Sequence, residues 1–215
     1  MTLPRETLAA PTLAAARALI GAHLVREGPV GRIARIVEVE AYIGEEDQAS
    51  HARFGRTARN AVMFGPPGIA YVYLVYGMHE CLNVVTEPDG RAAAVLIRAV
   101  EPIAGTAEMR AARLAHAMRF ARTPEARARA EARLRAMPEA RLAAGPGLVA
   151  AALDVGRVHT GLDLLDPESV LRIEAGEKPA RIAQTPRIGI GYAAAPWRSK
   201  PWRFIDPDSP SLSAR

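Results

Sequence analysis

The stretch "AYVYLVYGMHECLNVV", residues 70–85, predicts an antiparallel hairpin and with it the type of sheet in this protein. β-Branched and aromatic residues occupy both halves of the stretch, and Gly77 provides a turn between them. We expect one strand at 69–76 and its partner around 80–87. Because Tyr76 directly precedes the glycine, the hairpin should carry this ring at its tip.

Three of the five tyrosines in the chain lie in this hairpin. Tyr71 and Tyr73 share one strand face, whereas Tyr76 lies one step out of phase with them. An aromatic ring at the tip suits a wedge between base pairs, and rings on the strand behind it suit a base taken out of the helix. Ordinary packing within the hairpin is the alternative.

The preceding strand, "RIARIVEVEAY" at 32–42, alternates between an apolar and a polar face. The apolar face carries Val37, Val39 and Ala41, and the polar face carries Glu38, Glu40 and Tyr42. The polar face either meets solvent or lines a cleft in which a carboxylate serves as general base beside a stacking ring. His51 follows in the next loop, where a side chain with a near-neutral pKa is either simply exposed or functional.

The rest of the chain predicts an α+β fold: one domain spanning 1–215, with a curved antiparallel sheet, surrounding helices and a protruding β-hairpin. The Ala/Arg-rich segment 104–143 reads as a helical insert of two helices divided near "TPEA". Loop with short helical turns is expected at 43–68, and a short helix after "GPG". The remaining expected elements are a helix at 6–24 and strands at 92–100, 169–174 and 186–191.

The charge favours a nucleic-acid partner. The chain has 28 basic and 23 acidic residues, a net charge of +5, and all its basic residues except Lys178 and Lys200 are arginines. Arginine binds phosphate as a planar fork and stacks on bases. A general bias toward arginine codons would give the same composition. The segment 104–143 holds nine arginines and four glutamates, which also gives +5.

Several classes of site are excluded by what the sequence lacks. Cys81 is the single cysteine, so no internal disulfide can form. The five histidines show no metal-binding spacing, and neither a nucleotide-binding P-loop nor a GxSxG elbow is present. We expect no metal and no cofactor. The N-terminal residues lack the pattern of a signal peptide or a membrane span, which predicts a soluble, cytoplasmic protein and, as a simple expectation, a monomer.

The motif "VEVEAYIGEEDQASHARFGRTARNAVMFGPPGIAYVYLVYGMHECLNVV", residues 37–85, together with "VLIRAVEP" at 95–102, resembles the alkyladenine (3-methyladenine) DNA glycosylase family in its bacterial form. Weaker similarity extends through the N-terminal helix, "GPG" at 145–147, and "PRIGIGYAAAPWRSKPWRF" at 186–204. The resemblance therefore covers nearly the whole chain apart from the helical insert.

The resemblance implies a role for individual residues. Glu40 matches the residue that activates the hydrolytic water, and Arg98 matches an arginine that helps to hold that water. Tyr42 and Tyr73 match rings that stack on the flipped base. His51 matches the residue that packs on the other face of the base and hydrogen-bonds to its edge.

Two more matches and two departures complete the comparison. Asn83 matches the asparagine that screens out ordinary guanine through its exocyclic amine, and Tyr76 matches the wedge that fills the gap in the minor groove. The family pattern "NGPGKL" reads "AGPGLV" here, so Ala144 and Leu148 replace a polar residue and a lysine. One contact to phosphate or water is therefore in doubt, and the insert 104–143 has no assigned role.

The implied reaction is removal of alkylated or deaminated purines from double-stranded DNA, which leaves an abasic site. Such a protein would act at the nucleoid. No lysine lies near the motif, so a Schiff base with the sugar, and strand cleavage through it, are not expected. The alternatives are a non-catalytic protein that binds damaged DNA, an N-glycosyl hydrolase acting on nucleosides or RNA, and a plain nucleic-acid-binding module. A tip ring such as Tyr76 favours duplex DNA over a free nucleoside.

Overall fold

Two long antiparallel strands form the centre of the computed structural model, which describes residues 1–214. β2 (Arg32–Ile43) and β5 (Ala93–Ala104) pair along almost their whole lengths. The sheet runs in the order β3-β4-β5-β2-β1-β6, and β8 pairs with both β2 and β7. The other strands are β1 (His23–Arg26), β3 (Ala70–Val75), β4 (His79–Val85), β6 (Leu171–Glu174), β7 (Ala183–Thr185) and β8 (Arg203–Ile205). Their pairings are antiparallel, as predicted.

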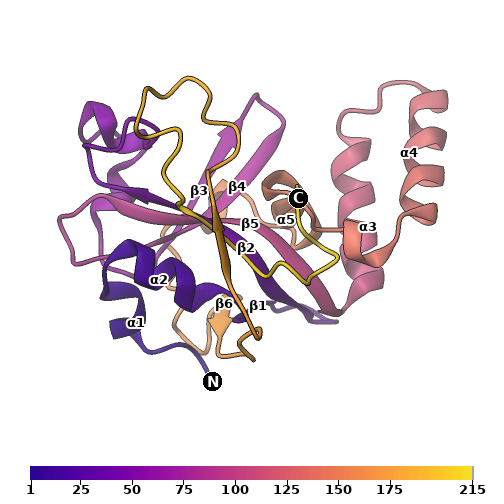
Figure 1. Ribbon diagram of the computed structural model, residues 1–215. Helices are drawn as coiled ribbons and strands as arrows, with labels where there is room; N and C mark the ends of the chain where they lie inside the picture. Colours follow the sequence, from indigo (N-terminus) through magenta and orange to yellow (C-terminus); the bar gives the residue numbers. More distant parts are fainter. Residues whose placement is uncertain (215) are drawn as a thin grey trace.

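Helices cover the sheet and also project from it (Figure 1). α1 (Arg5–Ala9), α2 (Thr12–Leu19) and α5 (Pro146–Ala152) bury their apolar side chains in the main core. α3 (Thr106–Met118) and α4 (Pro124–Ala136) form a pair that stands to one side of the sheet (Figure 1). Single 3₁₀ turns lie at His51–Phe54, Ala61–Phe64, Glu139–Arg141 and Arg157–His159.

The predicted division of the helical insert is confirmed, and its cause is local. Pro124 occupies the first turn of α4, where a missing N–H costs nothing. The hydroxyl of Thr123 caps the helix by accepting a hydrogen bond from the Ala126 amide at 3.2 Å. The α+β class, the loop with short helical turns, the short helix after "GPG" and the strand near residue 170 are likewise confirmed.

The prediction of one helix over 6–24 is wrong. Pro11 separates α1 from α2, because the residue before a proline disfavours helical backbone and Ala10 is extended instead. Residues 23–26 then form β1, which lies between β2 and β6. Ala22 and Leu24 are buried in the part of the chain that enters the sheet.

The predicted strand at 186–191 is also wrong. β7 ends at Thr185, immediately before Pro186, which has no N–H for a ladder. The residues that follow form an irregular segment along β2, and the Ile188 amide donates its hydrogen bond to the Glu40 carboxylate instead of to another strand.

The hairpin β3–β4 is formed as predicted, with Tyr76 at its tip. Tyr76 and Gly77 have φ angles of 51° and 69°, and the Met78 amide donates to the Val75 carbonyl at 3.1 Å. A non-glycine residue at positive φ is uncommon. The Tyr76 side chain is 89% exposed, so the turn holds a large ring in solvent.

Candidate active site

Strands β2 and β5 change phase at the same place. Ala34 and Ile36 lie in the main core, but so do Val39 and Ala41, which a regular strand would send to the opposite face. The alternation predicted that Val37 shares a face with Val39 and Ala41. This prediction is wrong, because Val37 packs in a second cluster.

The register shows where this phase change arises. Ile36 pairs with Val100 and Val39 pairs with Ile97, while Val37 and Arg98 have no partner across the ladder. This irregularity brings the side chains of Glu38 and Glu40 to the same side as Arg98, away from the apolar core.

The polar face of β2 does not meet solvent. Glu38 and Glu40 are both fully buried. For Glu40, Oε2 accepts hydrogen bonds from the Tyr42 hydroxyl at 2.9 Å and from Arg98 Nη1 at 3.3 Å, and Oε1 accepts from the Ile188 amide at 2.6 Å. Burial raises the pKa of Glu40, and this effect outweighs Arg98 and the hydrogen bonds that favour the charged carboxylate.

Glu38 anchors Arg98 from behind. Its carboxylate accepts hydrogen bonds from Arg98 Nε at 2.9 Å, Arg203 Nε at 2.8 Å and the Ser213 amide at 2.7 Å. Burial opposes the charge, but hydrogen bonds from Ser213 and Arg203 outweigh it and lower the pKa of Glu38. A charged Glu38 thus fixes the Arg98 guanidinium, whose other end reaches Glu40. From the sequence, Glu38 was placed on the polar face of β2 without a role of its own, and Arg203 was not singled out.

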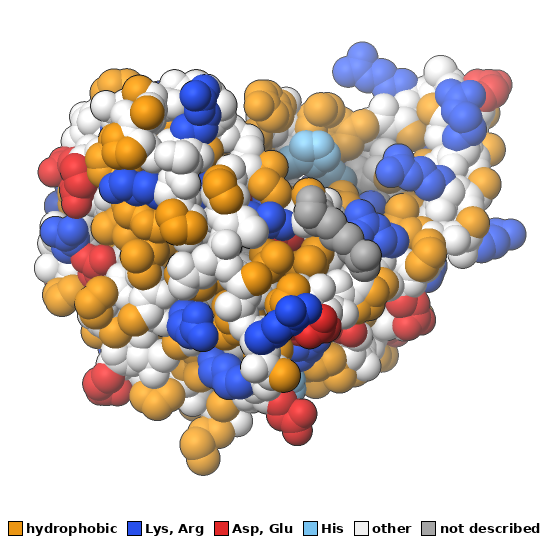
Figure 2. Space-filling view, viewed as in Figure 1, with side chains coloured by type: hydrophobic (Ala, Val, Ile, Leu, Met, Phe, Trp, Pro, Cys, Tyr) orange, Lys and Arg blue, Asp and Glu red, His pale blue; other side chains and the backbone are white. Residues whose placement is uncertain are grey.

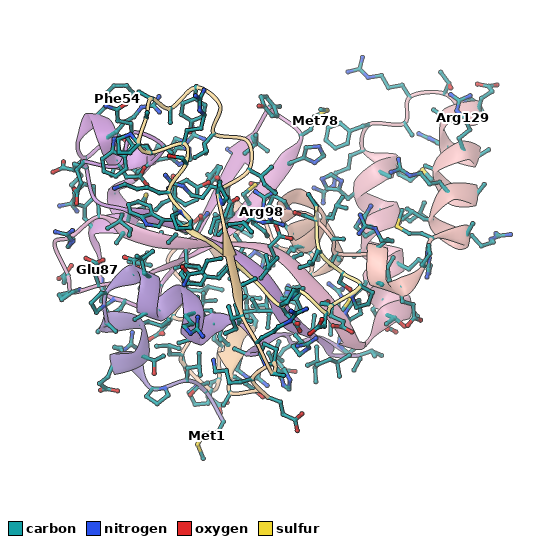
Figure 3. The ribbon with its side chains drawn as sticks, in the orientation of Figure 1. Met1, Phe54, Met78, Glu87, Arg98 and Arg129 are labelled. Atoms are coloured by element: carbon teal, nitrogen blue, oxygen red, sulfur yellow. The ribbon has the colours of Figure 1, made fainter. Side chains whose placement is uncertain are left out.

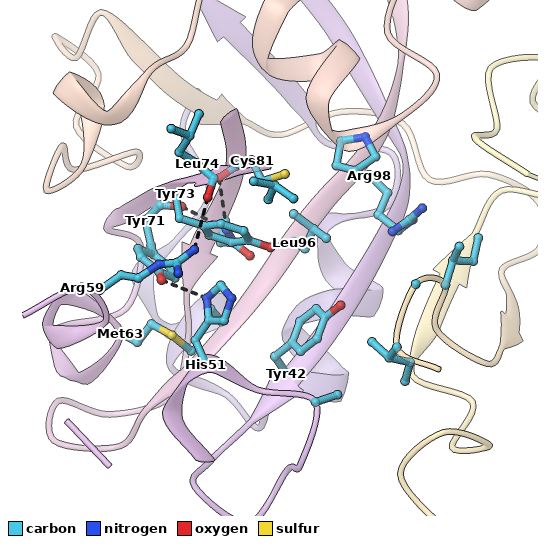
Figure 4. Close-up of a pocket in the computed structure, with 18 of the residues that line it drawn as sticks. Tyr42, His51, Arg59, Met63, Tyr71, Tyr73, Leu74, Cys81, Leu96 and Arg98 are labelled. Carbon is cyan, nitrogen blue, oxygen red and sulfur yellow. Dashed lines mark hydrogen bonds between the residues drawn. The ribbon is translucent and has the colours of Figure 1, made fainter. Parts of the chain in front are cut away.

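An aromatic pocket of about 430 Å³ opens in front of this network (Figure 4). Its wall contains six of the seven residues singled out from the sequence: Tyr42, His51, Tyr73, Tyr76, Asn83 and Arg98. The seventh, Glu40, lies one layer behind the wall, enclosed by Tyr42, Arg98 and Ile188. The volume lies in the range of pockets that hold a small organic ligand.

His51 lies at the mouth of the pocket, where its ring is exposed but packs on tyrosines. The His51 and Tyr73 rings meet edge to face with centroids 4.4 Å apart, and Nδ1 of His51 is 3.0 Å from the Tyr71 hydroxyl. Burial of this inner edge, with Arg59 and Arg53 nearby, lowers the pKa of His51 to about 4. The imidazole is therefore neutral near pH 7.

The tyrosine rings of the pocket differ in what surrounds them. Tyr71 is buried, and its hydroxyl fixes the orientation of the His51 ring. Burial raises the pKa of Tyr71 to about 12, and burial also raises the pKa of Tyr42 and of Tyr73. All three phenols thus stay neutral and keep their protons as donors.

Asn83 faces the pocket with its amide nitrogen already engaged. Nδ2 donates to the Tyr71 carbonyl at 3.1 Å and to the Cys81 carbonyl at 3.3 Å. Because both bonds hold the nitrogen on the strand side, the side-chain oxygen is left for whatever occupies the pocket.

A buried ion pair that the sequence analysis missed supports the other wall. Arg187 and Asp47 are both fully buried and joined by two hydrogen bonds, of 2.6 and 2.9 Å. The Arg187 guanidinium lies 4.7 Å from the Tyr42 ring centroid and 5.0 Å from that of Trp202. It therefore holds the Tyr42 ring from behind. The only signal in the sequence was an arginine at the start of the apolar run "RIGIGY".

The described part of the chain contains neither a cluster of metal-ligating side chains nor a helix that could span a membrane. Within residues 1–214, no three His, Cys, Asp or Glu side chains gather closely enough to hold a metal ion. None of the helices in that range has both the length and the apolar character needed to cross a membrane.

Known proteins resemble this chain over its whole length. The family profile described as "Methylpurine-DNA glycosylase (MPG)" matches residues 6–210. A relative from Methanocella arvoryzae is 48% identical over 214 residues, covering 99% of this chain and 96% of the relative. A second, from Myxococcus xanthus, is 41% identical over 98% of this chain and 93% of its own length. Both bear the name "Putative 3-methyladenine DNA glycosylase".

The match includes both segments that build the site, β2 with the hairpin and the irregular segment after β7. It agrees with the resemblance found in the motif at residues 37–85. This chain belongs to the methylpurine-DNA glycosylase family.

Proposed function

We propose that the protein flips alkylated or deaminated purines out of duplex DNA and hydrolyses their N-glycosidic bonds. The observation that carries this proposal is the Glu40 carboxylate, which Tyr42 and Arg98 hold directly behind an aromatic pocket of about 430 Å³. A pocket for a flat, electron-poor ring and a carboxylate beside its wall are the two parts that this reaction needs.

The flipped base enters between Tyr42 on one wall and His51 with Tyr73 on the other. An alkylated purine such as 3-methyladenine carries a positive charge, and a cation over an aromatic face gains about 0.5–2 kcal/mol. The neutral state of His51 suits this substrate, because a second positive charge in the pocket would repel it. A damaged base also costs less to unstack than a normal pair.

Asn83 provides selection against ordinary guanine. Its amide nitrogen is held by the Tyr71 and Cys81 carbonyls, so the side chain cannot easily turn away from a base in the pocket. The exocyclic amine of guanine collides with it, whereas adenine-derived bases and hypoxanthine lack that amine.

In the chemical step the bond between C1′ and the base nitrogen breaks, and its electron pair leaves with the base. A cationic methylated base leaves as a neutral molecule, and positive charge develops on the sugar as an oxocarbenium-like species. The oxygen of a water molecule then bonds to C1′, and Glu40 accepts the proton. The proposal requires that this water reach Glu40, whose carboxylate Tyr42, Arg98 and Ile188 surround.

The reaction stops at the abasic site. Cleavage of the strand by elimination requires an amine that forms a Schiff base with C1′. The chain has only two lysines, Lys178 and Lys200, and neither lines the pocket. Lys200 lies over the rings of Trp197 and Trp202 instead.

The proposed reaction is tested by measuring the release of free base from damaged DNA. Duplexes with one hypoxanthine or one ethenoadenine, and methylated genomic DNA, are incubated with the protein and with a Glu40→Gln variant. We expect released base and alkali-labile sites with the first, and a loss of about 10²–10⁴-fold in rate with the second while binding persists. The exposed Glu45→Gln is the matched control.

Three results would contradict the proposal. Strand breaks without heat or alkali would exclude a monofunctional enzyme. Tight binding to the lesion without release by either protein would identify a non-catalytic damage-binding protein. Release from a free nucleoside as fast as from duplex DNA would identify a nucleoside hydrolase.

A further inference from the structure

A second hollow, of about 370 Å³, lies between the β3–β4 hairpin and the α3–α4 pair. In Figure 2 this face is hollowed between the body of the molecule and the two helices, and histidine side chains show at the bottom of the hollow. Its charged and titratable lining consists of His79, Arg113, His116 and Arg133, and no carboxylate of residues 1–214 is part of it. A concave, basic site without an acid suits an anion.

The hollow is fixed relative to the hairpin tip. His116 on α3 donates from Nε2 to the carbonyl of Met78 at 3.1 Å, and its ring stacks on that of His79 with centroids 6.2 Å apart. Met78 lies two residues after Tyr76 and lines the hollow. Figure 3 places Met78 and Arg129 along the same edge of the molecule as Phe54. The helical pair is therefore docked beside the exposed tip ring.

The arginines here lack acidic partners. Arg113 is almost fully buried, and its guanidinium donates to the Leu142 carbonyl. Burial lowers the pKa of Arg113, and the charge of Arg133 lowers it further. Within residues 1–214, none of the nine arginines of 104–143 forms an ion pair. Two guanidinium groups that repel each other, with no carboxylate between them, are stabilised by a bound anion.

We propose that this hollow binds a backbone phosphate of the duplex next to the flipped base, with Arg133 as its main contact and Arg113 behind it. The proposal rests on the proposed function, since it takes the bound anion to be DNA. When Tyr76 enters the minor groove, the sugar–phosphate backbone beside the opened base pair passes the residues that follow the hairpin tip. The hollow lies at these residues. Helices α3 and α4 thus act as a second contact to the DNA.

The neighbouring face of the same helices provides a matched control. Arg135 is two residues from Arg133, and in the described part of the chain both are exposed and neither forms an ion pair. It lines a different hollow, between α3 and α4, together with Glu131 and Glu139. Mixed charges make that hollow unsuited to phosphate, so Arg135 reports the effect of one positive charge removed from α4 outside the proposed site.

The experiment measures the affinity of Arg133→Gln and Arg135→Gln for a duplex with one ethenoadenine between 50 and 300 mM salt. Loss of one phosphate contact lowers the slope of log K against log salt by about 0.9. We expect this reduction and a several-fold weaker affinity near 100 mM salt for Arg133→Gln, and neither for Arg135→Gln. Single-turnover base release at saturating protein should be unchanged in Arg135→Gln, because Arg135 lines neither the aromatic pocket nor the proposed phosphate site.

The outcomes separate this proposal from the proposed function. Equal slopes for the two variants, or an equal reduction in both, would overturn the phosphate site even if base release is normal. A selective effect of Arg133→Gln without base release by the wild type would sustain the site and overturn the glycosylase. Failure of the wild type to bind duplex DNA would overturn both.

Discussion

The Tyr42 hydroxyl donates a hydrogen bond of 2.9 Å to the Glu40 carboxylate, two residues away on the same strand. The ring that faces the pocket and the carboxylate behind it are thus parts of one unit. The bond favours the charged carboxylate, whereas burial opposes it and raises the pKa of Glu40 overall. Occupancy of the pocket and the protonation of Glu40 are therefore coupled through Tyr42.

A Tyr42→Phe variant should shift the pH dependence of base release. Glu40 acts as a base only when ionised, so activity falls as pH drops below its pKa. Because the lost hydrogen bond lowered that pKa, its removal raises it, and the acid limb moves to higher pH. Single-turnover rates between pH 5 and 9 measure the shift, and the rate should recover at the alkaline end. Tyr192→Phe, whose hydroxyl binds the Ala49 carbonyl, should leave the profile unchanged. An unmoved acid limb in Tyr42→Phe would contradict the coupling.

An Asp47→Asn variant should be strongly destabilised. Asp47 is the buried partner of Arg187, and removal of one member of a buried pair leaves an uncompensated charge at a cost of about 3–5 kcal/mol. The midpoint of urea unfolding measures the loss. Asp208→Asn is the control, because Asp208 and its partner Arg181 are exposed and their 3.0 Å contact is screened by water. If the two variants unfold at the same urea concentration, the buried pair does not stabilise the wall of the pocket.

A Tyr76→Ala variant should bind a lesion duplex roughly tenfold more weakly, because the flipped base would leave an unfilled gap and unstacking costs a few kcal/mol. Tyr76→Phe keeps the ring and should behave as the wild type, since the hydroxyl at the 89% exposed tip has no partner in residues 1–214. Ethenoadenine fluorescence during binding reports the flipped state. Equal amplitudes and affinities for the alanine variant would exclude a wedge.

The local parts of the site were predictable from the sequence, and the distant parts were not. The hairpin, its tip tyrosine and the strand with Glu40 and Tyr42 all follow from local patterns within residues 32–85. Arg187 and Asp47 are 140 positions apart, and no periodicity links two such residues. Their pairing depends on how the segment after β7 returns along β2.

Regular alternation was also the wrong assumption for β2. It predicted Val37 beside Val39 and left open whether the carboxylates meet solvent, whereas the irregular register gives Val37 to another cluster and buries both glutamates. The face on which each residue of β2 lies depends on its register with β5. The sequence of β2 alone does not contain this information. The single helix predicted over 6–24 failed for a simpler reason, since Pro11 alone was enough to divide it.

The paired phase change in β2 and β5 sets a condition for any attempt to redesign this chemistry elsewhere. On a regular ladder that begins with Ala34 and Ile36 facing the apolar layer, Glu38 and Glu40 would follow them into it. Grafting the reactive side chains onto an ideal β-scaffold would therefore bury unpaired carboxylates and yield an insoluble or misfolded product. A transplant must first reproduce the offset at Val37 and Arg98, so the backbone defect is the element to copy before any side chain.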